Sequence, residues 1–283
     1  MKRGEAILLS LILALALALR VWSINWGMPY ALHADEDNYL PGAVGMLMKG
    51  DWNPHYFRNP PLLTYLIALE LMLYLGMGKL VGLLQSAADI GHQLLVAPDP
   101  LYALARGNSA LLGTATVLLT YLAARRLLGT RTALLSGLLL AVAFLHVRDS
   151  HYAVNDVPAT FLLMASFCFA ARIFSSPVAT GIGPRAGHGG DGPPSDAAMR
   201  RSRSGAASAP LFAAHGKRAI LPTPWRDYLL AGGLLGLAVA TKYNVGLGAT
   251  AIVAAHLLRF RETRSIRRPA VHLPLAAAGL VSP

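Results

Sequence analysis

The sequence predicts an all-α protein: a polytopic bundle of transmembrane helices, with further helices lying on the membrane surface in the first outer loop. Three observations support this fold class. Of the 283 residues, 54% are hydrophobic and only 14% are charged, and the mean hydropathy is +0.47. Apolar runs approaching the roughly 20 helical residues that a bilayer requires recur along the chain. Basic residues are concentrated in alternate connections between these runs.

Six segments are apolar enough and long enough to be predicted as membrane crossings: 5–25, 107–124, 132–147, 157–174, 228–241 and 244–258. The first follows Met1-Lys2-Arg3, as a signal peptide would, but its apolar run continues to Trp22 and no small-residue cleavage site follows. We interpret it as a retained anchor. A seventh apolar segment begins near Pro269 and stops at Pro283, which favours an N-terminal fragment of a longer protein.

The segment 61–84 decides the topology of everything after it. It is long enough to cross, yet it carries Glu70 and Lys79. If it does not cross and the N-terminus is cytoplasmic, 18 of the 25 basic residues lie on the cytoplasmic side. If it crosses, most of these charges lie outside. Because basic residues favour cytoplasmic connections, we expect this segment to lie along the outer surface or to be re-entrant. The net charge of +11 is then an orientation signal, and nucleic acid is not an expected partner.

These segments divide the chain into three parts. Residues 1–175 form an N-terminal transmembrane catalytic module with an outer loop at 26–106, and 227–283 hold further, truncated transmembrane helices. Residues 176–226 are rich in Gly, Pro, Ser and Arg, which predicts a disordered basic cytoplasmic linker close to anionic membrane lipids. The single cysteine, Cys168, lies in an apolar run and predicts neither a disulfide nor a thiolate metal site.

On this topology, acids, histidines and cations converge on the outer side of the membrane. Asp35 and Glu36 are the first candidates. A carboxylate held beside apolar helices is partly desolvated, which raises its pKa and makes it a better general base. The alternative is structural: Asp35 caps a short helix and the next acids favour its positive end, although Pro41 fits such a helix poorly.

Asp156 lies where the third crossing ends and the fourth begins. A helix N-cap is one interpretation, supported by Pro158 just inside the next helix. The other is a site residue that, with Asp35 or Glu36, orients the acceptor or holds a divalent cation, because clustered carboxylates select hard cations. A divalent cation is thus the one candidate cofactor, and the sequence establishes none.

Lys242 stands between two apolar segments with almost no room for a loop, which is costly unless the side chain snorkels or has an anionic partner. The functional interpretation is that Lys242, with Arg58 or Arg106, binds the phosphate of a lipid-linked substrate. Tyr243 and His151 are further candidates on the same surface, though a histidine placed like His151 more often serves as a hydrogen-bonding residue at the interface.

Five short motifs follow one another along the chain: Asp35-Glu36, Asn59 to Tyr65, 106–129, Asp149 to Pro158, and Ala240 to Asn244. Together they resemble the GT-C superfamily of glycosyltransferases, and in particular family 39, the bacterial group related to protein O-mannosyltransferases and aminoarabinose transferases. The resemblance covers most of residues 5–260 outside the linker. Family members often have His or Tyr before the Pro-Pro pair, where this chain has Asn59. Full members also continue through more crossings, so the activity of this chain alone is left open.

The resemblance implies an enzyme integral to the cell membrane that takes a sugar from a polyprenyl-phosphate donor and passes it to a glycan, lipid or protein acceptor. It implies that Asp35 is the catalytic residue, that Asp156 belongs to the same extracytoplasmic site and that basic residues hold the lipid phosphate. The expected reaction is an inverting displacement with an Asp general base. A multi-span transporter and a non-catalytic membrane partner are the alternatives.

Overall fold

The computed structural model describes residues 2–30, 33–176 and 225–261. Within these ranges the chain consists of helices and connections, without a strand, so the predicted all-α class is confirmed. The predicted linker lies outside the described ranges except for residues 176, 225 and 226. The apolar segment that begins near Pro269 lies wholly outside them.

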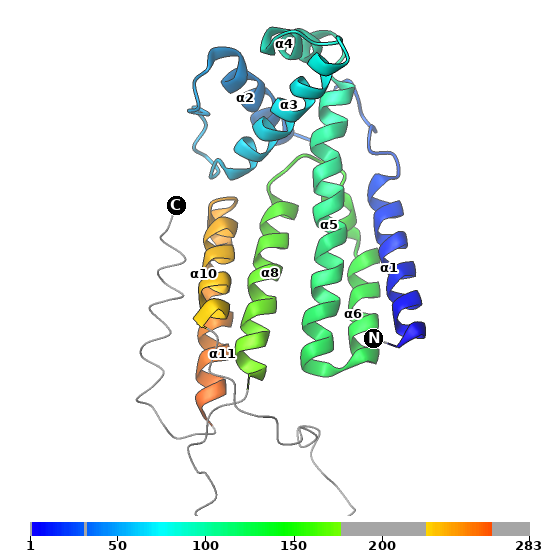
Figure 1. The fold of residues 1–283 in the computed structure, drawn as a ribbon, viewed down its shortest axis with the longest axis vertical. Helices are drawn as coiled ribbons and strands as arrows, with labels where there is room; N and C mark the ends of the chain where they lie inside the picture. Colours follow the sequence, from blue (N-terminus) through cyan, green and yellow to red (C-terminus); the bar gives the residue numbers. More distant parts are fainter. Residues whose placement is uncertain (1, 31–32, 177–224, 262–283) are drawn as a thin grey trace, which may run out of the picture.

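Long helices run side by side in a bundle (Figure 1). Helix α1 (Arg3–Val21) packs against α5 (Asp99–Leu128) and α6 (Thr130–Val142). On its other side α5 packs against α8 (Asp156–Ser175). Helices α10 (Trp225–Val239) and α11 (Ala249–Arg261), joined by the short 3₁₀ helix η1 (Tyr243–Gly248), pack on α8 in turn.

Four described helices are long and apolar enough to cross a membrane: α1, α3 (Leu62–Leu80), α5 and α8. Helices α6, α10 and α11 are shorter, with 13, 15 and 13 residues. The segment predicted as one crossing at 132–147 is two helices, because α6 ends at Val142 and the chain resumes as α7 (Phe144–Asp149) after an extended residue, Ala143.

Helix α5 is longer than a membrane crossing requires. Its 30 residues extend about 45 Å at 1.5 Å per residue, whereas the hydrocarbon core of a bilayer is about 30 Å thick. The excess lies at its N-terminal end, where α2 (Glu36–Lys49), α3 and α4 (Ala87–Val96) gather beyond the ends of α8 and α10 (Figure 1). We call these three helices the cap.

The cap has its own hydrophobic core, separate from the clusters between the long helices. Buried side chains of all three cap helices meet the first turns of α5 there, among them Tyr39, Leu40, Leu63, Ile67, Leu71, Ile90 and Leu101. Helix α3 packs mainly against α2. Although α3 is apolar enough to cross a membrane, its neighbours are therefore those of a cap helix.

Helix α2 continues through Pro41, which the sequence analysis treated as an obstacle to a helix at this place. A proline inside a helix costs about 3 kcal/mol, and here the burial of Tyr39, Leu40, Ala43 and Val44 on the same helix offsets that cost. The helix ends at Gly50, whose left-handed φ of 66° is the usual conformation after a helix C-terminus.

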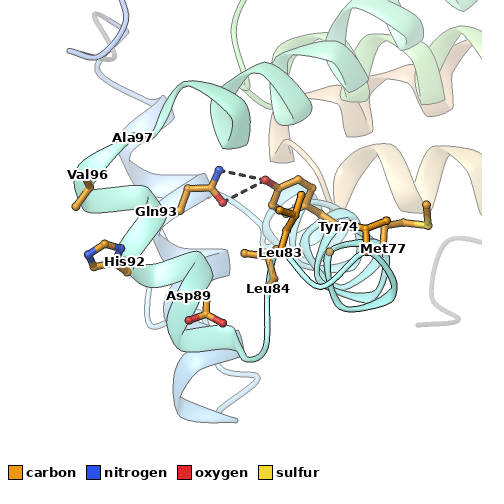
Figure 2. A pocket seen from close by; sticks show the side chains of 11 residues that line it. Tyr74, Met77, Leu83, Leu84, Asp89, His92, Gln93, Val96 and Ala97 are labelled. Atoms are coloured by element: carbon orange, nitrogen blue, oxygen red, sulfur yellow. Dashed lines mark hydrogen bonds between the residues drawn. The ribbon is translucent and has the colours of Figure 1, made fainter.

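A groove with a cavity of about 630 Å³ lies between the end of α3 and α4 (Figure 2). Tyr74 and Gln93 are hydrogen-bonded to each other in this groove. The Tyr74 hydroxyl lies 3.2 Å from Gln93 Oε1 and 3.1 Å from Gln93 Nε2. Leu83, Leu84 and Val96 make its walls largely apolar. None of the site residues predicted from the sequence lines this groove.

Candidate active site

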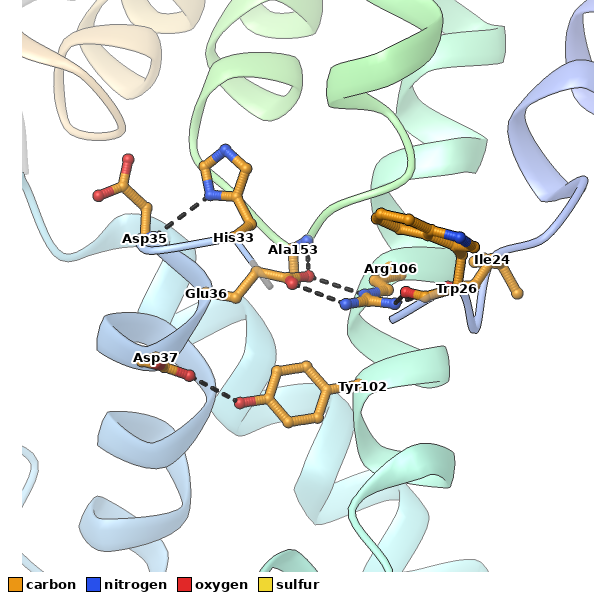
Figure 3. Close-up of polar contacts among 9 residues, drawn as sticks. All are labelled: Ile24, Trp26, His33, Asp35, Glu36, Asp37, Tyr102, Arg106 and Ala153. Carbon is orange, nitrogen blue, oxygen red and sulfur yellow. Dashed lines mark hydrogen bonds and ion pairs between the residues drawn. The ribbon is translucent and has the colours of Figure 1, made fainter. Parts of the chain in front are cut away.

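Glu36, in the first turn of α2, is fully buried and serves as the anchor of the cap. Its two carboxylate oxygens accept hydrogen bonds from Arg106 Nε at 2.8 Å and Nη2 at 2.7 Å (Figure 3). The backbone N–H of Ala153, in the loop before α8, donates to the same carboxylate at 2.7 Å. One acid therefore joins α2, α5 and the loop that leads to Asp156.

The Arg106 guanidinium is also extensively hydrogen-bonded. Besides Glu36, it donates from Nη1 to the carbonyl oxygens of Ile24 at 2.8 Å and Trp26 at 3.1 Å. The rings of Tyr102 and Tyr152 lie 5.6 and 5.7 Å from its guanidinium carbon. These bonds use four of the five N–H donors of the side chain. A guanidinium paired in this way carries little free charge toward a phosphate, in contrast to the role predicted for it.

Asp35 faces elsewhere, although it precedes Glu36 directly. Its carboxylate points away from the Glu36 and Arg106 pair (Figure 3). Asp35 occupies the N-cap position of α2, yet its side chain makes no capping bond. Its hydrogen bonds come from the backbone: the N–H donates to His33 Nδ1 at 3.2 Å, and the carbonyl accepts from the Asn38 N–H at 3.2 Å. Among the described residues, no hydrogen bond or ion pair engages its half-buried carboxylate. The capping alternative therefore does not account for this side chain.

Asp156 and Lys242 form an ion pair between the start of α8 and the residue before η1. Both side chains are partly open to solvent, 41% exposed for Asp156 and 31% for Lys242. Asn155 occupies the N-cap position of α8, and its amide donates to the Thr241 carbonyl at 3.1 Å. Lys242 thus has an anionic partner in the protein itself, and the N-cap interpretation of Asp156 is wrong by one residue.

Tyr39 is a fully buried tyrosine one helical turn after Asp35. It packs edge-on against Tyr56 with ring centroids 6.2 Å apart. Burial raises the pKa of the Tyr39 hydroxyl above its usual range, and the nearby Tyr56, Asp35 and Asp156 raise this pKa further. The Tyr39 hydroxyl therefore stays protonated.

The other predicted residues lie at the edges of this arrangement. Arg58 is exposed and has no ion pair within the described ranges, and Tyr243 is 61% exposed. His151 Nε2 donates a hydrogen bond to the Leu19 carbonyl at 2.8 Å. This contact agrees with the alternative that His151 is a hydrogen-bonding residue at the membrane interface. A small cavity of about 130 Å³ opens beside His151, Arg106 and Trp26.

A metal centre is not supported by the donor set. In the part of the chain that the structure describes, no group of three or more His, Cys, Asp or Glu side chains lies close enough to hold an ion. Asp156 is also engaged by the ammonium group of Lys242, which competes with a cation for the same oxygens.

Two contributions to the site were missed in the sequence. Tyr39 lies four residues after Asp35, and that spacing places both on one helix face, so it was open to prediction. Tyr102 and Tyr152, which flank Arg106, come from α5 and from the loop before α8, and no local pattern brings them together.

Comparisons with known proteins agree with this fold. The family model described as dolichyl-phosphate-mannose-protein mannosyltransferase matches residues 53–180. An uncharacterized protein of Aquifex aeolicus (strain VF5) is 30% identical over 162 residues, which are 55% of this chain and 28% of that protein. The structure of the Saccharomyces cerevisiae protein O-mannosyltransferase Pmt1-Pmt2 complex bound to the sugar donor matches with a TM-score of 0.61 at 18% identity, over 99% of this chain and 32% of the yeast chain.

The chain thus spans about a third or less of the length of the proteins it matches. Within that part, the resemblance predicted from the sequence is confirmed by two separate comparisons. This chain is similar to the family 39 protein O-mannosyltransferases of the GT-C superfamily, in sequence over residues 53–180 and in fold.

Proposed function

We propose that this chain carries the active site of a membrane glycosyltransferase that moves a sugar from a polyprenyl-phosphate donor to a glycan, lipid or protein acceptor. The observation that carries the proposal is the difference between two adjacent acids. The Glu36 carboxylate accepts hydrogen bonds from Arg106 and from the Ala153 N–H, whereas the Asp35 carboxylate makes no hydrogen bond or ion pair among the described residues. The buried pair of Glu36 and Arg106 thereby fixes the helix that presents the Asp35 carboxylate.

In the proposed reaction Asp35 accepts a proton from the hydroxyl or amine of the acceptor. The acceptor atom attacks the anomeric carbon from the face opposite the phosphate, the bond to the phosphate oxygen breaks, and the configuration inverts. The departing polyprenyl phosphate takes the electron pair, and its negative charge is met by cations. Arg58 and Lys242 are the candidates for this contact, since Arg106 is already paired with Glu36.

The proposal places the site on the extracytoplasmic side. The cap lies at the end of the bundle away from the N-terminus (Figure 1). The opposite end is basic: Arg125 contacts Glu5 near the start of α1, and Arg126 bonds Ser175 at the end of α8. Because basic ends of membrane helices favour the cytoplasm, the basic end supports a cytoplasmic N-terminus and an extracytoplasmic cap.

The experiment is an Asp35→Asn substitution in the full-length protein, with transfer measured in membranes supplied with a polyprenyl-phosphate sugar. We expect transfer to fall at least about a hundredfold, which is the lower range for loss of a general base, with an unchanged melting temperature. Asp37→Asn is the matched control, since this exposed acid one position beyond Glu36 accepts only a bond from the Tyr102 hydroxyl at 3.3 Å.

Transfer at the wild-type rate in Asp35→Asn would refute the catalytic role. A substrate flux into vesicles that needs no lipid-linked donor would support a transporter. A wild-type protein with neither activity would support the non-catalytic alternative.

A further inference from the structure

Arg20, near the end of α1, is a completely buried cation without an acidic partner among the described residues. Its Nη1 donates to the carbonyl oxygens of Ala16 at 2.9 Å and Ala141 at 3.1 Å. Its Nη2 donates to the Leu140 carbonyl at 3.3 Å and lies 2.8 Å from His146 Nδ1. A buried arginine is costly, so these backbone and imidazole contacts must compensate its charge.

Two of the three carbonyls that Arg20 binds, those of Leu140 and Ala141, lie at the end of α6. The last four carbonyls of a helix lack partners within it and carry partial negative charge. Leu140 and Ala141 are among the last residues of α6, which ends at Val142. Arg20 therefore acts as a C-terminal cap that is supplied by another helix. These contacts stand at a helix end where the sequence has neither Pro nor Gly.

Arg20 and the 150–156 loop share one tightly packed space against Gly113 of α5. A Cβ atom at position 113 would lie 2.4 Å from Ser150 Oγ and 2.9 Å from Arg20 Nε, closer than atoms can approach. Ser150 is fully buried and donates to the His146 carbonyl at 2.6 Å. The same loop then supplies the Ala153 N–H to Glu36 and ends at Asp156.

We propose that Arg20 is a positioning residue for the 150–156 loop: by capping α6 and holding His146 at the start of α7, it fixes the backbone that presents Ala153 to Glu36 and Asp156 to Lys242. It does not contact the proposed reacting groups. The expected importance of Arg20 for catalysis rests on the proposed function. The effect of Arg20 on the conformation of the 150–156 loop does not.

Arg20→Met tests the inference, with amide hydrogen exchange measured over the peptide that covers residues 147–157. We expect exchange of this peptide to rise at least tenfold, while peptides from α3 and α4 stay at their wild-type rates. Arg20→Lys should restore part of the protection, because an ammonium group reaches some of the same carbonyls. Wild-type protection of 147–157 in Arg20→Met would overturn the proposal.

Gly113→Ala is the second variant, in case Arg20→Met does not fold. The added methyl group must displace Arg20 or Ser150, so the same peptide should lose protection; unchanged exchange there contradicts the inference. Arg125→Met is the matched control, because it removes a cation that pairs with Glu5 at the other end of α1. If Arg125→Met exposes 147–157 equally, Arg20 has only a general effect on stability, and the proposal fails.

Sugar transfer separates this inference from the proposed function. If the wild-type protein transfers sugar, Arg20→Met should lower kcat at least tenfold with a smaller change in the KM for the donor, and Arg20→Lys should recover part of kcat. An unchanged kcat despite a loosened loop would refute the catalytic importance of Arg20. If the wild-type protein transfers no sugar, the proposed function fails, and hydrogen exchange still decides whether Arg20 holds the loop.

Discussion

Arg106 and Glu36 face each other through two parallel hydrogen bonds, and the side chains are 1% and 0% exposed. They are 70 residues apart in the chain. This pair joins the long helix α5 to the first turn of the cap, one residue from the proposed base. On the proposed function, this pair fixes the helical turn that presents Asp35 and is a positioning pair.

Breaking this pair should cost stability as well as activity. Removal of one partner of a buried ion pair leaves an uncompensated charge and typically costs about 3–5 kcal/mol. We expect Glu36→Gln and Arg106→Gln each to lower the free energy of unfolding by about this amount in detergent. The double variant should cost less than the sum of the two, because the interaction is lost only once. Additive losses would show that the two side chains do not depend on each other.

Arg58 should contribute to binding of the lipid-linked donor and not to the stability of the fold. Its side chain is exposed and has no ion pair within the described ranges. A charge-assisted hydrogen bond contributes about 1.5–3 kcal/mol, so we expect Arg58→Gln to raise the donor KM at least about tenfold and to leave the melting temperature unchanged. Arg148→Gln is the control, since Arg148 is also exposed but pairs with its neighbour Asp149 at 2.7 Å. Equal effects of both substitutions would indicate a general effect of surface charge.

The sequence was sufficient to predict the fold class and to place the candidate residues around Asp35 and Asp156, because these follow from local signals: apolar runs and acids at their ends. The sequence could not show which of the adjacent acids Asp35 and Glu36 is buried in an ion pair and which has a carboxylate without a partner among the described residues. Adjacent residues on a helix point about 100° apart, and which of them faces the core depends on Arg106, far along the chain.

The break at Ala143 was unpredictable for the same reason. Residues 132–147 are predominantly apolar, and neither Pro nor Gly stands where the helix ends. The end of α6 is instead bound by Arg20, which is 121 residues away from Ala141. Likewise, Lys242 was predicted either to snorkel or to have an anionic partner, and Asp156 was named for another role, but only the structure pairs them.

The ion pair between Asp156 and Lys242 can be tested by exchanging the charges of the two side chains. A partly exposed ion pair contributes about 1 kcal/mol or less, so Asp156→Lys or Lys242→Asp alone should destabilise the protein slightly by juxtaposing like charges. The double exchange should restore the melting temperature. We expect sugar transfer to remain lost in the double variant, because the proposal needs a cation at 242 for the lipid phosphate. Recovery of both properties would show that the pair is purely structural.

The membrane side of the cap can be tested with single cysteines in a Cys168→Ser background. Phe57 and Gln85 are exposed residues before and after α3, and Arg131 is exposed in the first turn of α6, at the other end of the bundle. Because α3 packs within the cap, a membrane-impermeant maleimide should label Phe57→Cys and Gln85→Cys from outside intact cells, and Arg131→Cys only after permeabilisation. Labelling of positions 57 and 85 from opposite sides would make α3 a crossing. If positions 57 and 85 are both accessible only from the cytoplasm, the orientation drawn from the basic end is inverted, although α3 still remains on one side.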